Sequence, residues 1–205
     1  MGSPTRPYRG ISATERTARR RAELMAAAFD LVGTAGWEQA TMTAICARAK
    51  LTERYFYESF ASRDELLLAV FDELAERMRG AVVDALASAP PDPEGTARAA
   101  ITVFVDLLTE DPRIGRVAIV ESAATGSLRR RRHQILGEFA DLIVARSQVV
   151  FGADALPGPR DRLNALLFTG GLAEVLTAWL AGEVTASKTD IIETAVNQFV
   201  RTAHK

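Results

Sequence analysis

The sequence predicts an all-α fold of about nine helices. Three observations lead to this prediction. Apolar residues recur at helical spacing along most of the chain, no segment shows a convincing strand pattern, and stretches rich in glycine and proline separate the periodic segments. With 205 residues, the chain can form one large domain or two modest ones.

The first two helices are indicated by apolar spacing and by their terminal residues. A helix is expected from near Thr14 to just before Gly36, because apolar residues from Leu24 onward recur at i, i+3, i+4, i+7 and i+8. Thr41 or Thr43 then begins a second helix, since a threonine hydroxyl can cap a helix N-terminus. One face of this helix is apolar and should be buried: Ile45, Cys46 and Ala49.

A short third helix and a long fourth helix follow. Thr52 suits the N-cap of the third helix. Ser62 and Glu65 have the spacing of a capping box, which opens a helix that continues towards Leu86. The segment at residues 88–95, SAPPDPEG, is the clearest boundary in the chain because its three prolines cannot continue a helix.

Five further helices are expected beyond this boundary. The pair Asp111-Pro112 stops the first of them, a loop rich in glycine and proline at residues 152–159 precedes the last two, and Ser187 and Asp190 are placed to cap the last one. The expected ranges are Thr96–Thr109, Ile114–Ala123, Leu128–Phe151, Arg160–Ala181 and Thr189–Ala203.

Composition argues against several classes of protein. The single cysteine, Cys46, excludes an internal disulfide and fits a reducing, cytoplasmic location. The two histidines, His133 and His204, lie far apart, so neither a zinc cluster nor a Ser-His-Asp triad is expected, and the sequence has no phosphate-loop motif. No apolar run approaches the ~18 residues of a membrane span. The chain is therefore expected to be no enzyme, to need no metal or cofactor, and to enter no membrane.

The charges are unevenly distributed along the chain. Residues 1–63 hold 10 lysines and arginines against 6 acids, whereas the rest holds 15 against 20, which together give the net charge of −1. This asymmetry favours a polyanionic partner for the N-terminal end only.

Residues 41–67 have the pattern of a helix-turn-helix. In this motif the second helix enters the major groove of DNA, while the first helix braces it through an apolar inner face. The residues that suit the inner face are Ile45, Ala49, Leu51, Phe56 and Phe60. The other side chains of the second helix should point away from that core: Glu53, Arg54, Tyr55, Tyr57 and Glu58.

The outward side chains suit contacts with duplex DNA. Arg54 fits bidentate contact with O6 and N7 of a guanine, and Tyr55 fits a thymine methyl group or a phosphate. Other polar residues suit the phosphate backbone. The predicted DNA-binding residues are Thr43, Lys50, Thr52, Glu53, Arg54, Tyr55, Tyr57 and Arg63. Periodicity alone does not decide for DNA binding, and it favours the alternative of an ordinary helical hairpin with a polar solvent face.

From Arg20 to Phe71 the chain resembles the TetR family of transcriptional regulators. The family pattern is an amphipathic helix ending in G-[FW], then T-x-x-x-I-A-x-x-A-G-[VL]-[ST], a short recognition helix with a tyrosine, and F-x-[SN]-[KR]-[DE]-x-L. The corresponding residues here are Gly36-Trp37, Thr41, Ile45, Cys46, Ala49, Lys50, Leu51, Thr52, Tyr57, Phe60, Ser62, Arg63, Asp64 and Leu66.

Two residues depart from this pattern. Cys46 replaces the usual alanine, and a buried thiol behaves as a small apolar group, although a redox role stays open. Lys50 replaces the usual glycine of the turn. If the turn is left-handed there, Lys50 bears roughly 1–2 kcal/mol of strain, which its charge beside phosphates could offset.

The resemblance implies a homodimeric, ligand-responsive repressor that binds a palindromic double-stranded DNA operator and is released by a small hydrophobic or amphipathic effector. A dimeric small-molecule-binding protein without DNA-binding function is the alternative. The expected regions are a disordered arm at 1–13, a DNA-binding domain at 14–67 with a linking helix at 63–87, and a ligand-binding and dimerisation domain at 88–205.

Within the C-terminal domain, the resemblance implies a pocket and a four-helix interface between two copies. The pocket candidates are Phe104, Leu108, Glu121, Phe139, Asn164 and Phe168. The interface candidates are Gly171, Val175, Trp179, Ile192 and Phe199, each of which could equally belong to the core of one protomer. The pair Gly170-Gly171 inside a helix suggests close backbone approach, because each glycine costs roughly 1 kcal/mol there.

Two arginine runs leave alternatives open. The resemblance implies that the start of the first helix, which holds Arg16, Arg19, Arg20 and Arg21, approaches the phosphate backbone, and a solvated helix end explains the run equally well. Residues 129–132 are four arginines at a helix N-terminus, where cations are poorly placed. They are expected to form a solvated or ion-paired face.

Overall fold

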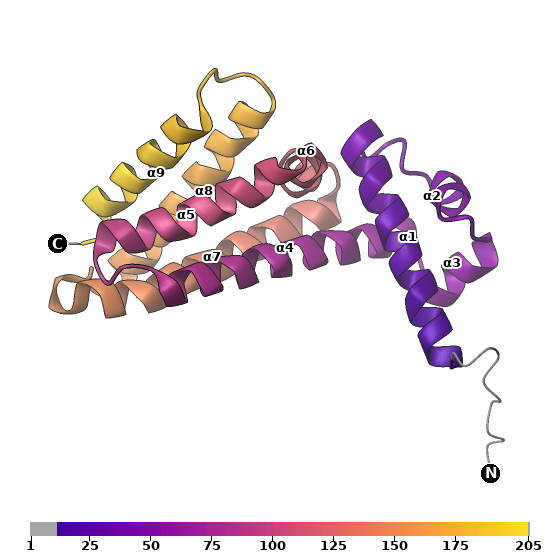
Figure 1. Ribbon diagram of the computed structural model, residues 1–205, viewed down its shortest axis with the longest axis horizontal. Coiled ribbons are helices and arrows are strands. Elements are labelled where there is room, and N and C mark those ends of the chain that lie inside the picture. Colours follow the sequence, from indigo (N-terminus) through magenta and orange to yellow (C-terminus); the bar gives the residue numbers. More distant parts are fainter. Residues whose placement is uncertain (1–11, 205) are drawn as a thin grey trace, which may run out of the picture. The chain divides into compact units, whose positions relative to one another are not determined.

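The computed structural model describes residues 12–204, and the predicted arm at residues 1–13 lies outside them except for its last two residues. Within the described residues the regular elements are helices, apart from one isolated bridge between Ala155 and His204 (Figure 1). The all-α prediction is confirmed. The chain forms two compact units, one up to Asp72 and the other from Glu73 onward.

The N-terminal unit is built from three helices and the start of a fourth. The first begins with a capping box, in which Ser12 accepts a hydrogen bond from the N–H of Glu15 and the Glu15 carboxylate accepts one from the N–H of Ser12. It ends at Gly36, whose φ of 89° favours glycine. The helices are α1 (Ala13–Ala35), α2 (Met42–Ala49), α3 (Glu53–Ser59) and α4 (Arg63–Ser88).

The core of this unit lies where α1, α2 and α3 pack on one another. Three of the five residues predicted for the inner face, Ile45, Phe56 and Phe60, are buried, whereas Ala49 and Leu51 are half-buried. The α1 and α4 side chains that complete the core are Leu24, Ala27, Ala28, Val32, Leu66 and Val70. An ion pair between Asp30 of α1 and Arg48 of α2 adds a polar tie.

In the predicted capping box of α4, one of the two hydrogen bonds has a donor one residue earlier than expected. Ser62 accepts a hydrogen bond from the N–H of Glu65 at 3.1 Å, as predicted. The Glu65 carboxylate, however, accepts one from the N–H of Ala61 at 2.7 Å rather than from that of Ser62. This reciprocal pair still satisfies two N–H groups, that of Glu65 in the first turn of α4 and that of Ala61 just before the helix.

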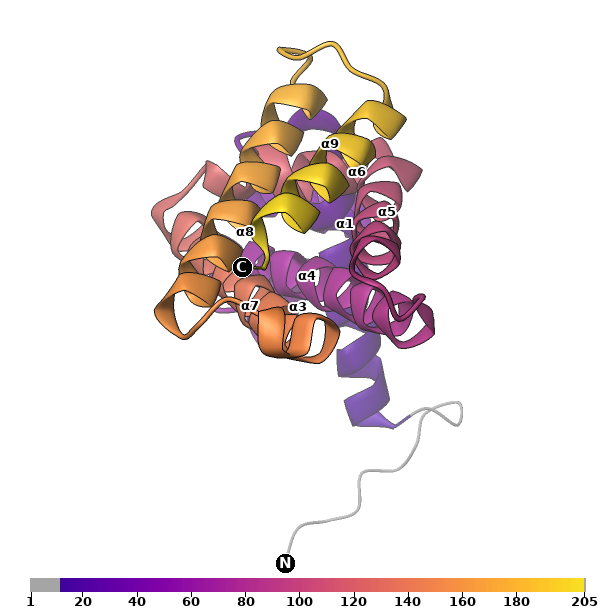
Figure 2. The same ribbon diagram turned by 90° about the vertical axis from the view of Figure 1, so that its left-hand side faces the viewer.

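The C-terminal unit contains the rest of α4 and five further α-helices, with three short turns between them. α5 packs against α9, α7 packs against α8, and α8 and α9 lie side by side (Figures 1 and 2). The α-helices are α5 (Pro93–Glu110), α6 (Pro112–Gly115), α7 (Gly126–Phe151), α8 (Pro159–Leu180) and α9 (Lys188–Thr202). As predicted, Ser187 and Asp190 form a capping box at the start of α9.

Two predicted segments need correction. α5 begins at Pro93 rather than Thr96, because Asp92 caps it and a proline at the first helical position has no N–H to leave unsatisfied. The segment Ile114–Ala123 is not one α-helix. It consists of α6, a π-helical turn at Arg116–Val120 and a 3-10 turn at Glu121–Ala123.

One helix is more apolar than the sequence analysis expected. α8 is long enough and apolar enough to cross a membrane when judged by length and composition only, with a mean hydropathy of 1.4 over its best 18-residue window. Such a helix is weak evidence for a membrane span, since helices of other proteins meet the same criteria. Only 22% of that window is buried, so much of the apolar surface of α8 is not covered by the rest of the chain.

Candidate nucleic-acid interface

The turn between α2 and α3 is tight because Lys50 adopts a left-handed conformation. Its φ and ψ are 55° and 37°, and among residues 12–204 it is the only non-glycine residue with a positive φ. The N–H of Lys50 donates to the carbonyl of Ala47, and the N–H of Leu51 donates to that of Cys46. The turn is thus left-handed at Lys50, which was the condition for backbone strain stated from the sequence, and this strain is roughly 1–2 kcal/mol.

α3 has a buried face and an exposed face. Phe56 is completely buried and Phe60 is 2% exposed, so these two rings fix the helix against its unit. On the other face, the Arg54 side chain is 84% exposed and Tyr57 is 59% exposed. A helix of two turns held in this way presents Arg54 and Tyr57 to any partner that approaches from solvent.

Four other predicted residues are also exposed. Thr43 lies in the first turn of α2, Lys50 in the turn, and Glu53 in the first turn of α3. Thr52 occupies the N-cap position of α3 as predicted, but its hydroxyl makes no capping hydrogen bond. The Thr52 hydroxyl is therefore not committed to α3 and is available to an outside acceptor.

Tyr55 and Arg63 are partly covered by their own unit. The guanidinium of Arg20 lies 4.3 Å from the centroid of the Tyr55 ring, and that of Arg63 lies 4.4 Å from the centroid of the Trp37 ring. These are cation–π contacts. The prediction that Tyr55 points away from the core needs correction, because one face of its ring packs against α1.

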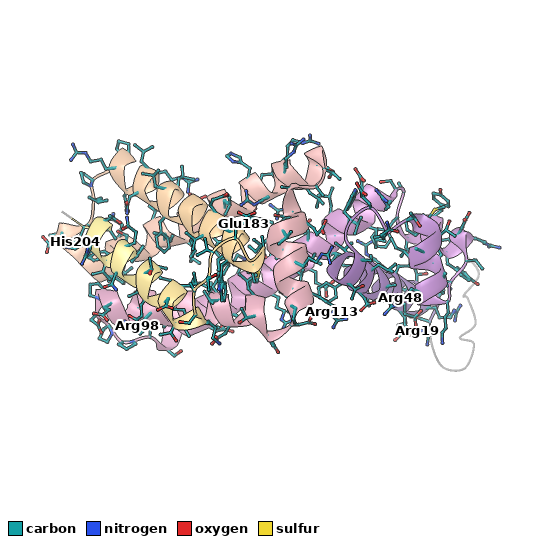
Figure 3. All side chains as sticks on the ribbon, turned by 90° about the horizontal axis from the view of Figure 1, so that it is seen from above. Arg19, Arg48, Arg98, Arg113, Glu183 and His204 are labelled. Carbon is teal, nitrogen blue, oxygen red and sulfur yellow. The ribbon has the colours of Figure 1, made fainter. Side chains whose placement is uncertain are left out.

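The arginine cluster of α1 divides between two environments. Arg19 is exposed and pairs with Glu23 on the same helix at 3.5 Å (Figure 3 labels Arg19). Arg21 instead lies 4.0 Å from the centroid of the Phe60 ring and donates a hydrogen bond to the carbonyl of Ser59 at 2.9 Å. The sequence left two alternatives for these arginines, a contact with phosphates or a solvated helix end. Arg21 does neither, because it binds the end of α3.

Glu58 joins two arginines from different helices. Its Oε1 accepts a hydrogen bond from Nε of Arg54 at 3.2 Å, and its Oε2 accepts one from Nη2 of Arg20, also at 3.2 Å. From the sequence, Glu58 was expected on the outward face of α3 but was assigned no role. The i,i+4 spacing of Arg54 and Glu58 was a usable signal for the first contact. The contact with Arg20, 38 residues away, left no signal in the local sequence.

Cys46 is buried in the N-terminal unit. Burial raises the pKa of its thiol, and the negative charge of Glu53 raises it further. Because the thiolate is the reactive form, a raised pKa lowers the reactivity of Cys46 and favours a packing role.

The pocket candidates of the C-terminal unit fall into separate groups. The rings of Phe104 and Phe139 meet edge to face with centroids 5.6 Å apart, and the ring of Phe168 meets that of Phe199 at 5.1 Å. Leu108 is completely buried, and Asn164 is half-buried. The carboxylate of Glu121 accepts a hydrogen bond from Nε of Arg116 at 3.2 Å. Of the six candidates, Phe104 and Phe139 contact each other, and Phe168 contacts Phe199, which was not a candidate. The structure does not bring the other three candidates into these ring contacts.

The interface candidates differ in how much surface they offer. Gly171 and Val175 are exposed on α8. Trp179 is half-buried, and its Nε1–H donates to the carbonyl of Ala186 at 2.8 Å. Ile192 is buried within the protomer, so it offers little surface to a second copy. Phe199 packs on Phe168 of the same protomer.

Comparison with known proteins agrees with this arrangement. Residues 24–70 match a family model described as bacterial regulatory proteins, tetR family. The chain carries a TetR-family N-terminal domain. The matched range runs from Leu24 of α1 to Val70 of α4 and includes the whole of α2 and α3. The resemblance to TetR-family regulators noted in the sequence is confirmed.

Solved structures show that the fold of the chain is the TetR-family regulator fold. The transcriptional regulator FadR from Bacillus subtilis, solved in complex with stearoyl-CoA, has a TM-score of 0.75 at 16% identity, covering 89% of this chain and 99% of that chain. The fatty acid degradation regulator FadR from Bacillus halodurans scores 0.73 at 18% identity, with 91% and 97% covered. A TetR-like transcriptional regulator from Rhodococcus sp. RHA1 scores 0.68 at 18% identity, with 90% and 95% covered.

Proposed function

We propose that this chain is a transcriptional repressor that binds a palindromic DNA operator as a homodimer and is released by a small hydrophobic or amphipathic effector. The observation that carries the proposal is the exposed face of α3. Arg54 and Tyr57 stand in solvent on a short helix that Phe56 and Phe60 anchor from behind. This is the arrangement that a recognition helix needs to place side chains in the major groove.

Each exposed side chain has a defined role in this proposal. The guanidinium of Arg54 donates two hydrogen bonds to O6 and N7 of a guanine. The phenol of Tyr57 and the hydroxyl of Thr52 donate to phosphate oxygens, which sets the register of the protein on the duplex. Lys50, exposed in the turn, adds a charge beside the phosphates and so compensates for its backbone strain.

The apolar surface of α8 supports the homodimer. Leu163 is 60% exposed and Leu167 is 75% exposed, although both are large apolar residues, and they lie one turn apart in the first half of α8. A Cβ added at Gly170 or Gly171 would meet no atom of this protomer within 4 Å. The protomer's own packing therefore does not require glycine at these two positions, and the backbone there is open to close approach by a second copy. In this reading the unburied part of α8 is covered by another chain rather than by lipid.

The effector is proposed to bind among the aromatic side chains of the C-terminal unit. The two edge-to-face contacts, Phe104–Phe139 and Phe168–Phe199, place four rings on four helices. Such rings suit an apolar chain. The structural likeness to a regulator solved with stearoyl-CoA favours a long acyl chain attached to a polar group as the first effector to test.

A gel shift tests the DNA-binding part of the proposal. The probes are duplexes from the region upstream of the gene and a scrambled duplex of the same composition. We expect retardation of an upstream fragment at lower protein concentration, with an affinity that falls steeply as salt rises because bound phosphates release counterions. Equal binding of both probes, or binding that does not depend on salt, would contradict it.

Calorimetry tests the effector part. With stearoyl-CoA as the probe, we expect tighter binding to the free protein than to the protein–DNA complex, since effector and operator must weaken each other by the same factor. Equal affinity in the two titrations would refute induction by this ligand while leaving the DNA-binding result intact.

A further inference from the structure

We infer that Glu58 is a positioning residue for base recognition, because it orients the guanidinium of Arg54 and is itself held by Arg20. The inference rests on the proposed DNA-binding function of α3. It assigns a specificity role to an acidic residue, whereas the contacts assigned above to Arg54, Tyr57, Thr52 and Lys50 come from cations and hydroxyls.

The geometry places the Glu58 carboxylate between two guanidinium groups. One oxygen accepts from Nε of Arg54 and the other from Nη2 of Arg20, each at 3.2 Å. Both carboxylate oxygens are thus used, one towards the exposed tip of α3 and one towards α1. A carboxylate bound on both sides has little freedom to rotate, so the direction of its bond to Arg54 is defined.

The contact with Arg20 is what makes this orientation persistent. An exposed i,i+4 pair by itself contributes little, since two long side chains must be ordered in water. The Arg20 side chain, however, is only 20% exposed, and its guanidinium stacks over the Tyr55 ring. Its Nη2 also donates to Oγ1 of Thr17 at 3.3 Å. The guanidinium of Arg20 is therefore held in place. Its hydrogen bond fixes the Glu58 carboxylate, which in turn fixes the direction of the hydrogen bond to Arg54.

The choice of nitrogen matters for base recognition. A guanidinium presents five N–H donors in a rigid planar fork. Glu58 takes the Nε–H of Arg54, which leaves the two terminal nitrogens to donate side by side. That end of the fork matches the O6 and N7 acceptors of guanine. With its orientation set before binding, Arg54 loses less rotamer freedom when it meets the base.

Glu58 also has an electrostatic effect that can be measured separately. A carboxylate on the DNA-facing side is repelled by phosphates of any sequence. Arg20 and Arg54 flank it, and the three side chains together carry a net charge of +1 rather than +2. Glu58 should therefore weaken binding to arbitrary DNA while it strengthens the preference for a guanine at one position.

These opposite effects give the inference a distinctive test. Wild-type protein first selects its preferred site from a randomised library of duplex DNA. The dissociation constants are then measured for that site and for a scrambled duplex, and their ratio is the discrimination. For Glu58→Ala we expect discrimination to fall roughly 3- to 10-fold, a part of the roughly 5- to 150-fold that a bidentate base contact supplies. Affinity for the scrambled duplex should rise.

Two further variants separate positioning from charge. Glu58→Gln keeps an acceptor oxygen and loses the charge, so it should raise affinity for the scrambled duplex while losing less discrimination than Glu58→Ala. The matched control is Glu38→Gln, which removes the same charge from an exposed turn of the same unit. It should leave discrimination unchanged.

A double-mutant cycle with Arg54→Ala shows whether Glu58 acts through Arg54. In the Arg54→Ala background, Glu58→Ala should cause no further loss of discrimination, because the side chain that it orients is gone. Thermal unfolding of each variant reports on folding, and Glu58→Gln serves if Glu58→Ala is destabilised.

Three outcomes would overturn the inference. The first is discrimination in Glu58→Ala that does not fall: an unchanged value would mean that Glu58 does not position Arg54, and an improved value would mean that Glu58 competes with DNA for Arg54. The second is an equal loss of affinity for both duplexes, which indicates a merely structural role. The third is an additive cycle. If wild-type protein selects no sequence at all, the proposed function fails first and the inference falls with it.

Discussion

The guanidinium of Arg20 stacks on the ring of Tyr55, and this contact joins α1 to the helix proposed to read DNA. Arg21 repeats the arrangement on Phe60 one residue later. Two of the four arginines between residues 16 and 21 thus hold α3 through the side that faces α1. The positive charge of this segment is therefore larger than the charge that DNA could contact directly, because Arg20 and Arg21 stabilise α3 instead.

The neighbouring residues Phe56 and Tyr57 should respond to truncation in opposite ways. Phe56→Ala removes a completely buried ring and should lower the free energy of unfolding by about 3–5 kcal/mol. Tyr57→Ala, at an exposed site, should change it by less than about 0.5 kcal/mol while weakening binding to DNA of every sequence. Urea denaturation followed by circular dichroism, together with gel shifts, measures both quantities. A large stability loss in Tyr57→Ala would mean that its ring is part of the core.

Lys50→Gly should separate stability from DNA binding. Glycine adopts the left-handed conformation without the Cβ clash, so the variant should be more stable by up to about 1 kcal/mol after the greater flexibility of the unfolded chain is counted. Loss of the lysine charge should reduce the slope of log affinity against log salt by about 1 if Lys50 contacts a phosphate. The control is Lys50→Asn, which tolerates the same conformation better than lysine. Unchanged salt dependence in both variants would remove Lys50 from the interface.

Arg54→Lys should preserve charge and lose the fork. We compare the selected site with a variant in which the contacted guanine is replaced by another base. The difference in binding free energy between these two duplexes should fall by about 1–3 kcal/mol, since lysine cannot reproduce the planar bidentate contact. The salt dependence should stay close to that of the wild type because the net charge is unchanged. Competition gel shifts with single-base variants measure the effect. Retained preference at every position would reassign base recognition to another residue.

Leu167→Glu should prevent self-association through α8. Placing a carboxylate on the most exposed apolar residue of this helix buries an unpaired charge in the proposed interface, which is unfavourable by several kcal/mol. Sedimentation should show a monomer, and operator affinity should drop because the two DNA-binding units that contact the half-sites are no longer linked. The control is Val149→Glu, which adds the same charge at a residue of α7 that is 71% exposed. It should leave self-association unchanged. A dimeric Leu167→Glu protein would place the interface elsewhere.

Glu193→Gln should affect stability only at higher pH. Hydrogen bonding to Arg98 of α5 holds the pKa of the Glu193 carboxyl below its ordinary value of 4.5 (Figure 3 labels Arg98). The stabilisation is therefore fully present above pH 4.5 and is lost as the pH falls through the lowered folded pKa. The wild type should have the higher melting temperature at pH 7, and the difference should shrink below pH 4.5. A difference that is constant with pH would show that the pair acts through packing.

Local sequence signals predicted much of the fold, and tertiary contacts account for what they missed. Thr41 caps α2 and Gly36 ends α1 as expected, because capping and left-handed turns depend on one or a few neighbouring residues. For Lys50 the sequence left the geometry of the turn open, because lysine replaces the glycine that the family pattern has there, and the structure shows the left-handed conformation. The stacking of Arg20 on Tyr55 was not predictable, since side chains this far apart in the chain leave no periodic pattern. The outward face of α3 was predictable in outline, but which of its residues are held by α1 was not.

The π-helical turn at Arg116–Val120 illustrates the same limit. The sequence there has ordinary helical periodicity, and the extra residue per turn arises where the backbone at Gly115 passes close to its neighbours. A Cβ on Gly115 would lie 2.8 Å from the carbonyl oxygen of Leu108 and 3.0 Å from Cδ1 of Leu180. Packing of this kind depends on three helices at once, so no single segment of sequence reports it.

The chain contains two tryptophans, one in each compact unit, and each has a distinct polar neighbour. Trp37 has the Arg63 guanidinium over its ring, whereas the indole N–H of Trp179 is bound to the carbonyl of Ala186. Replacing either one by phenylalanine leaves a single tryptophan, so its emission and quenching, excited at the red edge where tyrosine does not absorb, can be recorded for one unit at a time. Unfolding of the two units, or the arrival of a ligand in either, can thus be observed optically without attaching a dye.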